Sequence, residues 1–215
     1  MESSVNSRRS YHSPHRQEQA RRTRRTILEA ALSLFVERGY AGTSLADIAG
    51  AAGVALKTVQ AVFGTKAKLL SDLWDVSVVG DDEAIPVAER DWFRQTLDEP
   101  DPRRQLQVFL EHVARIKRRM GALTEVVRRA AQADPEIGAL WQLFQDQIVA
   151  DHRLVAERLA AKGVLRDGLD AAEAAEIMGI LNHPSVHYLA VVERGWSEER
   201  FERWLVDAVT QQLLG

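Results

Sequence analysis

The chain of 215 residues contains no cysteine. Disulfide bonds, thiolate metal ligands and thiol nucleophiles are therefore excluded, and the composition fits a reducing compartment. No apolar run approaches the ~20 residues that span a bilayer. Residues 1–20 carry charge, serine and proline instead of the apolar stretch of a signal peptide. We therefore expect a cytoplasmic protein without a membrane partner.

The common signatures of catalysis are also missing. The sequence has no G-x-S-x-G stretch and no pair of acids at a convincing spacing. His183 and His187 stand four residues apart, which can place two imidazoles on one helix face. Pro184 starts a new helix between them, however, and no third ligand has a matching spacing. We expect no catalytic residue, no metal site and no cofactor, and a helical enzyme is the least favoured class.

Charge is distributed unevenly along the chain. The 28 basic and 31 acidic side chains give a net charge of -3, which alone gives no reason to expect a polyanionic partner. Residues 1–70, however, carry 11 basic and 5 acidic groups, whereas the remaining 145 carry 17 and 26. A charge of +6 beside one of -9 suggests that nucleic acid or an anionic membrane meets only the N-terminal part. A solvated basic tail would explain the same charges equally well.

Apolar side chains recur at helical spacing from about Gln17 onward, and no stretch alternates long enough to form a strand. The fold class is therefore all-α, with nine or ten helices and one or two domains. We expect helices over residues 17–38, 44–52, 55–63, 66–78, 86–97, 171–181, 184–194 and 198–214, and apolar stripes at helical spacing over residues 106–120, 123–130 and 137–159. Residues 1–20 resemble a disordered basic arm, and the composition changes after residues 80–82.

A helix-turn-helix pattern lies in the basic part. Ser44 is followed three positions later by Asp47, a capping-box spacing that opens a short helix. Gly53 provides a permissive turn residue, and Val54 packs beneath the turn. Three short helices with such a turn are typical of DNA-binding modules, whose second helix enters the major groove.

The surrounding residues agree in order and spacing with a known family. The agreeing positions are Ile27, Leu28, Ala30, Ala31, Leu34, Phe35, Gly39, Tyr40, Thr43, Ser44, Leu45, Ile48, Ala49, Ala52, Gly53, Val54, Thr58, Val59, Phe63, Lys66, Leu69 and Leu70. Over residues 21–81 the chain resembles the tetracycline-repressor (TetR) family of bacterial regulators. The resemblance implies a homodimeric repressor, in which residues 21–81 bind DNA and residues 82–215 dimerise and bind a small molecule.

The resemblance, together with the charge and chemistry of the side chains, indicates which residues would meet DNA. They are Arg21, Arg22, Arg24, Arg25, Thr43, Ser44, Leu56, Lys57, Thr58, Gln60, Ala61 and Lys66. The four arginines would contact phosphate or the minor groove, unless they form a solvated tail. Thr43 and Ser44 would cap a helix and touch phosphate, and Lys66 would lie by a phosphate at a helix N-terminus.

The recognition helix would span about Ala55 to Phe63. Lys57 and Thr58 would face DNA, and Leu56 and Ala61 would offer apolar contact to thymine methyl groups. The family usually has an aromatic residue and then His or Tyr where this chain has Gln60 and Val62. Gln60 would donate to phosphate or read an adenine edge, two roles that the sequence leaves equally open.

The C-terminal region supplies candidates for an effector pocket and a dimer interface. The pocket candidates are Trp74, Trp92, Phe93, Phe109, His112, Trp141, Phe144, Asn182, His183, His187 and Tyr188, although an aromatic residue at helical spacing is more often core. Candidates for the interface, which would pair the last helices in a four-helix bundle, are Ile177, Leu181, Phe201, Trp204, Leu205, Ala208 and Val209.

These features predict a repressor that binds a near-palindromic double-stranded operator as a homodimer. An apolar small molecule would release it by shifting the fourth helix through Trp74 and Leu70. A constitutive or nucleoid-associated DNA-binding protein without an effector is the alternative.

Overall fold

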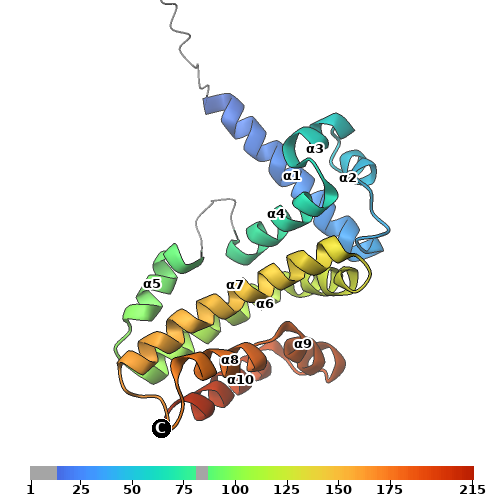
Figure 1. Ribbon diagram of the computed structural model, residues 1–215. Coiled ribbons are helices and arrows are strands. Elements are labelled where there is room, and N and C mark those ends of the chain that lie inside the picture. Colours follow the sequence, from blue (N-terminus) through green and yellow to red (C-terminus); the bar gives the residue numbers. More distant parts are fainter. Residues whose placement is uncertain (1–13, 81–86) are drawn as a thin grey trace, which may run out of the picture.

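The computed structural model describes residues 14–80 and 87–215, and in these ranges the protein is built from helices alone (Figure 1). The N-terminal helices are α1 (Pro14–Arg38), α2 (Leu45–Ala51), α3 (Leu56–Phe63) and α4 (Lys66–Val79). The C-terminal helices are the 3-10 turn η1 (Val87–Glu89), α5 (Asp91–Asp98), α6 (Pro102–Ala131), α7 (Pro135–Ala161), α8 (Ala171–Leu181), α9 (Pro184–His187), the π-helical segment η2 (Tyr188–Glu193) and α10 (Glu198–Leu213). The all-α prediction is confirmed.

Helices α1 to α4 form a head on a longer helical body (Figure 1). Ile27, Phe35, Ile48 and Val59 are fully buried where α1, α2 and α3 meet. Gly53 between α2 and α3 has a φ of 66°, a left-handed conformation that glycine adopts without a steric cost. This turn fixes the angle at which α3 leaves α2.

The body is organised around α6 and α7, which run side by side (Figure 1). Each has proline in its first turn and an aspartate N-cap, Asp101 for α6 and Asp134 for α7. Proline fits this position because its missing N–H would lack an intrahelical partner anyway. The helices α8 and α10 pack against the pair and against each other.

The buried side chains form two clusters. The first contains Leu70 and Trp74 of the head together with Met120, Leu123 and Phe144 from α6 and α7. The second lies farther along the body, where α5, α6, α7, α8 and α10 meet. The first cluster therefore crosses the domain boundary that the sequence suggested near residue 81.

Three elements differ from the sequence-based expectations. Residues 14–20, expected in a disordered arm, belong to α1, because Pro14 can begin a helix; residues 1–13 of that arm lie outside the described residues. The two stripes expected between residues 106 and 130 are one continuous helix, α6. The helix expected over 184–194 becomes π-helical after His187, with the Arg194 amide donating to the Leu189 carbonyl.

Within residues 14–80 and 87–215, no single helix has the length and hydropathy to cross a membrane. The adjacent α2 and α3 meet those criteria only when joined, and they are bent by 113° at the turn.

Candidate DNA-binding surface and effector cavity

Helix α3 has one buried face and one exposed face. Val59 and Phe63 point into the head and are buried. The other predicted DNA-contacting residues of this helix lie outside the core: Leu56, Lys57, Gln60 and Ala61 are exposed, and Thr58 is half-buried. Val62 is also exposed. The structure thus gathers these side chains on one helix, in a position to enter a groove.

The predicted cap of α2 is confirmed at Ser44. The Asp47 amide donates to the Ser44 hydroxyl at 3.1 Å, and the Ser44 amide donates to the Asp47 carboxylate at 2.9 Å. The Ser44 hydroxyl also donates to the Asp47 carboxylate, and this hydrogen bond, followed by the one from the Ser44 amide, holds the pKa of Asp47 below its usual value. The exposed Ser44 hydroxyl remains on the same side of the head as the start of α2.

Thr43, unlike the neighbouring Ser44, does not lie at the surface. Its side chain is buried, and its hydroxyl donates to the carbonyl oxygens of Leu34 at 3.2 Å and Gly39 at 2.9 Å. The expectation that Thr43 caps the helix and touches phosphate is therefore wrong, because the hydroxyl is used to fix the end of α1.

Lys66 connects α4 to the loop between α1 and α2. Its ammonium donates to the carbonyl oxygens of Tyr40 and Thr43, both at 2.9 Å, and lies 4.1 Å from the centre of the Tyr40 ring. Burial, with the nearby Asp134 and Glu136 carboxylates, raises the pKa of Tyr40 to about 12. Lys66 thus has at most one N–H left for the phosphate contact that the sequence suggested.

Arg24 likewise has a partner inside the head. Its guanidinium donates to Asp72 of α4 at 3.0 Å and lies 4.9 Å from the centre of the Phe63 ring. Lys68 donates to the same carboxylate, so that Asp72 ties α4 to α1. The i, i+4 spacing of Lys68 and Asp72 is visible in the sequence, but the partner from α1 is not.

The other three predicted arginines remain at the surface. Arg21, Arg22 and Arg25 are exposed along the first half of α1, where Arg25 lies 3.7 Å from Glu29. An exposed pair at this distance contributes little to stability. These side chains are therefore available to a phosphate backbone.

A cavity of about 1070 Å³ lies between the head and the body. Its wall includes the end of α1, α4, α6, α7, α9 and η2. The predicted pocket residues that line it are Trp74, Trp92, Phe109, Asn182, His187 and Tyr188. The cavity therefore borders both the predicted regulatory region and α4, the helix that comes directly after the recognition helix α3.

Five predicted pocket residues do not line this cavity, and most of them are core. Phe93 is fully buried in the second cluster. Phe144 stacks on Trp74 at 4.2 Å between ring centres, and Trp141 meets the edge of Trp74 at 6.2 Å. Helical spacing identifies a buried stripe but not which part of it borders a cavity.

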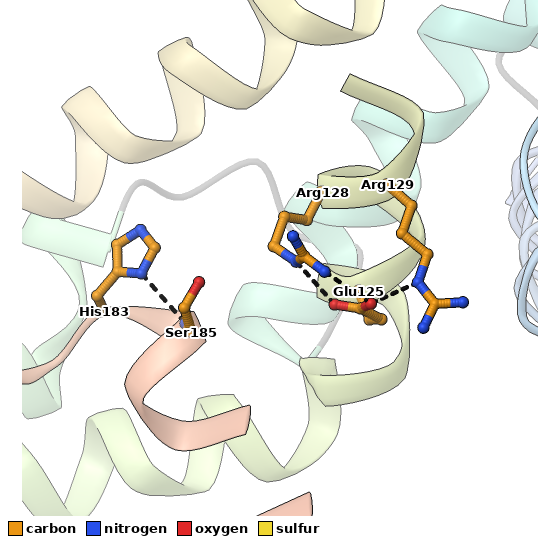
Figure 2. A network of polar contacts seen from close by, with 5 residues as sticks. All are labelled: Glu125, Arg128, Arg129, His183 and Ser185. Atoms are coloured by element: carbon orange, nitrogen blue, oxygen red, sulfur yellow. Dashed lines mark hydrogen bonds and ion pairs between the residues drawn. The ribbon is translucent and has the colours of Figure 1, made fainter. Parts of the chain in front are cut away.

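The other two are histidines. His112 stacks on Trp92 at 4.4 Å and borders a separate cavity of about 160 Å³; burial lowers its pKa. His183 caps α9, where its Nδ1 accepts from the Ser185 amide at 3.1 Å (Figure 2). Burial and nearby Lys117 lower the pKa of His183. Within the described chain, no three His, Asp or Glu side chains converge as a metal would require.

Several polar residues of the cavity wall were not identified from the sequence. Glu125 accepts from Arg128 at 2.8 and 2.9 Å and from Arg129 at 2.5 Å (Figure 2). These arginines, Arg128 first, hold the pKa of Glu125 below its usual range. Glu198 of α10 also borders the cavity, and it lies 3.0 Å from His187, one of the pocket residues predicted from the sequence. In the sequence, the i, i+3 and i, i+4 spacing of Glu125 with Arg128 and Arg129 is the feature that could have indicated this group.

The adjacent residues Asp151 and His152 of α7 also border the cavity. Asn182 lies 3.0 Å from the Nε2 atom of His152. Burial lowers the pKa of His152 to about 3, so this imidazole is neutral. Burial also raises the pKa of Asp151 to about 6.

Three of the predicted interface residues cannot form a contact between subunits. Phe201, Leu205 and Val209 are buried in the second cluster of the same chain. They face the chain's own core because α10 packs on α6 and α8. The remaining candidates, all half-buried, are Ile177, Leu181, Trp204 and Ala208.

Comparison with known proteins identifies the family. The sequence model of the family described as bacterial regulatory proteins, tetR family, matches residues 27–73. The regulator TtgR of Pseudomonas putida, described as an HTH-type transcriptional regulator, is 32% identical over 169 residues, which cover 75% of this chain and 77% of TtgR. The chain belongs to the TetR family. The HTH-type regulator CymR of Pseudomonas putida is also 32% identical, over 202 residues covering 89% of this chain and 91% of CymR.

Solved structures agree with this TetR fold. NalD of Pseudomonas aeruginosa, described as the secondary repressor of the MexAB-OprM multidrug efflux pump, has a TM-score of 0.70 and 24% identity, covering 91% of this chain and 98% of NalD. A SmeT–triclosan complex has a TM-score of 0.69 and 19% identity, covering 90% and 92%. This TetR-family protein is thus a DNA-binding transcriptional regulator and not an enzyme, and α2 and α3 are its helix-turn-helix.

Proposed function

We propose that this regulator is a repressor that binds a near-palindromic operator as a homodimer and leaves it when an apolar small molecule binds. The observation that carries the proposal is the cavity of about 1070 Å³. Tyr40, which follows α1, and Trp74 of α4 both border it, so its occupant contacts the DNA-binding head. NalD is described as a repressor and SmeT as a complex with triclosan, and both share this fold. The cytoplasm, where operator DNA lies, is the expected location.

The DNA-binding surface is formed by α3, the start of α2 and the first half of α1. Lys57, Thr58 and the Ser44 hydroxyl meet phosphate or base edges, while Leu56 and Ala61 approach thymine methyl groups. Gln60, exposed beside Lys57, either donates to phosphate or pairs with adenine.

The homodimer forms through the outer faces of α8 and α10. Ile180 on α8 is 68% exposed and apolar, and Ile177, Leu181, Trp204 and Ala208 are half-buried around the same helices. A second copy would cover this apolar area. A two-fold dimer places its recognition helices about 34–36 Å apart, which matches successive major grooves.

Release from DNA follows from contacts between the cavity and the head. A ligand that displaces Tyr40 or Trp74 also acts on α4, because Lys66 joins α4 to the Tyr40 carbonyl. When α4 moves, α3 moves with it, so the distance between the two recognition helices of the dimer changes. The coupling free energy is about 1–3 kcal/mol in such systems, and DNA must weaken ligand binding by the same factor.

Genomic footprinting with the purified protein tests the DNA half of the proposal, since the operator shows symmetry and half-site spacing directly. A screen for compounds that release this operator, followed by ligand titration with and without DNA, tests the other half. We expect equal coupling factors in both directions. If no compound releases the operator, the protein is a constitutive DNA-binding protein; a monomer at micromolar concentration in light scattering would contradict the dimer.

A further inference from the structure

Lys117 occupies an unusual position on α6. Its side chain borders the large cavity, but its Nζ atom is fully buried and has no hydrogen-bond partner within residues 14–80 and 87–215. A buried ammonium costs several kcal/mol unless a carboxylate or other acceptor compensates it. A sequence that served stability alone would place an apolar residue at this site.

The groups around Lys117 do not compensate its charge. Glu198 of α10 is the carboxylate that acts on it, but no hydrogen bond joins the two, and a Glu198 carboxylate oxygen lies 3.0 Å from His187 Nε2 instead. The Phe201 ring of α10 lies with its centre 5.4 Å from Nζ. On the other sides are His152 of α7 and His183 before α9, whose pKa values the Lys117 charge helps to lower.

Two further acidic residues of the cavity wall, Glu125 and Asp151, do not pair with Lys117. Glu125 is held by Arg128 and Arg129. Asp151 on α7 has its pKa raised by burial, with no contribution from Lys117. An acceptor within hydrogen-bonding distance of Nζ is therefore what the described wall near Lys117 lacks.

We propose that the effector is an apolar organic acid whose anionic group pairs with Lys117, while its apolar body lies along the aromatic wall that includes Trp74 and Phe109. The flexible four-carbon stem of Lys117 allows the ammonium to turn from the wall to the cavity surface. This assignment of the ligand class rests on the proposed function, because it concerns the occupant of the same cavity.

Binding of such an acid should draw a proton onto the protein. Burial lowers the pKa of Lys117 to about 7, so at pH 8 most molecules hold a neutral amine in the free state. An anion beside Nζ favours the charged ammonium and raises its pKa again. The free protein therefore takes up close to one proton per bound acid at pH 8.

Two probes that differ in one acid group test the pairing. They are 8-anilinonaphthalene-1-sulfonate and its uncharged analogue N-phenyl-1-naphthylamine, titrated into the full-length protein by fluorescence. We expect the sulfonate to bind about tenfold more tightly or better, the scale of one charge pair. In Lys117→Met the preference should fall to about twofold or less, while the Arg103→Met control, which removes an exposed charge from the same helix, should keep it.

Calorimetric titration of the sulfonate at pH 8 in two buffers of different ionisation heat provides the second readout. Uptake close to one proton in the wild type, absent in Lys117→Met, supports the proposal. Equal affinities for the two probes, or a preference and proton uptake that survive in Lys117→Met, would overturn it. If the uncharged probe releases the operator as well as the sulfonate does, the acid assignment fails while the proposed effector-controlled function stands.

Discussion

The buried amine of Lys117 should make stability depend on pH. Its pKa is about 7 in the folded protein and about 10.5 when unfolded, so the charged form is the destabilising one. The cost is fully present below pH 7 and disappears as the pH rises through the unfolded pKa. Between these values the unfolded chain binds one more proton, and stability gains roughly 1 kcal/mol per pH unit from this group.

Urea unfolding of the wild type and Lys117→Met at pH 7, 8 and 9 measures this difference. We expect Lys117→Met to be the more stable protein at pH 7 and its advantage to shrink at each higher pH. A constant difference over this range would mean that Lys117 is equally solvated in the two states.

Lys66 should act on stability more than on the salt dependence of DNA binding. Replacing it by Met removes the ammonium from two carbonyl oxygens and from the Tyr40 ring. We expect the free energy of unfolding to fall by about 1–3 kcal/mol, the cost of leaving such acceptors unpaired. Urea unfolding checks the first effect and binding at several salt concentrations the second. A slope that decreases by about one unit, as for a lost phosphate contact, would instead support the phosphate role.

Single residues show where sequence reasoning succeeds. Ser44 and Asp47 were predictable because a capping box is local, with both partners within one helical turn. Thr43, next to Ser44, was assigned wrongly because its partners Leu34 and Gly39 become neighbours only when α1 ends in the turn. Lys117 gave no signal, since a lysine on an amphipathic helix normally reaches water.

At the scale of elements, we expect the arginines of α1 to have two different roles, DNA binding for some and stability for another. Replacing Arg21, Arg22 and Arg25 together by Gln should weaken binding to every DNA sequence. Each lost phosphate contact should reduce the slope of log K against log salt by about 0.9. Arg24→Gln should leave that slope unchanged and lower stability, because Arg24 pairs with Asp72. Anisotropy titrations on operator and unrelated DNA measure the first effect, and thermal unfolding the second.

The opposite pattern would contradict this division. A triple variant with an unchanged slope would show that the three exposed arginines are only a solvated surface. A reduced slope in Arg24→Gln would show that its guanidinium leaves Asp72 for the DNA.

Most helix boundaries were predictable because caps, prolines and glycines mark them locally. Asp170 and Ser197, for instance, cap α8 and α10 directly before the positions where helices were expected to begin, residues 171 and 198. The π-helical η2 was not predictable, because residues 188–193 have ordinary helical spacing and the wider turn is a matter of hydrogen bonding. The position of the cavity also depends on how α4, α6, α7 and η2 assemble, which periodicity does not encode.

At the scale of the whole molecule, charge and packing divide the chain differently. The charge of residues 1–70 is +6 and that of the rest is -9, which separates a DNA-reading head from a body that phosphates repel. The first hydrophobic cluster, in contrast, joins the head to α6 and α7. Effector binding in the body can therefore reach the head through continuous packing.

The fragment of residues 1–80 tests this shared core. The sequence predicts that it still binds DNA, weakly, because it lacks the dimer. The structure adds that Leu70 and Trp74 lose their partners Met120, Leu123 and Phe144 in this fragment. We therefore expect lower stability as well as lower affinity, measured by urea unfolding and operator binding.

Trp74→Ala distinguishes a shared core from an independent head. In the full chain, loss of a buried Trp should cost about 3–5 kcal/mol. In the fragment, where α6 and α7 no longer cover Trp74, the same substitution should cost much less, because the side chain is already exposed to water in the folded head. Equal costs in both contexts would show that the head buries Trp74 by itself, and coupling between cavity and DNA would then need a route other than this core.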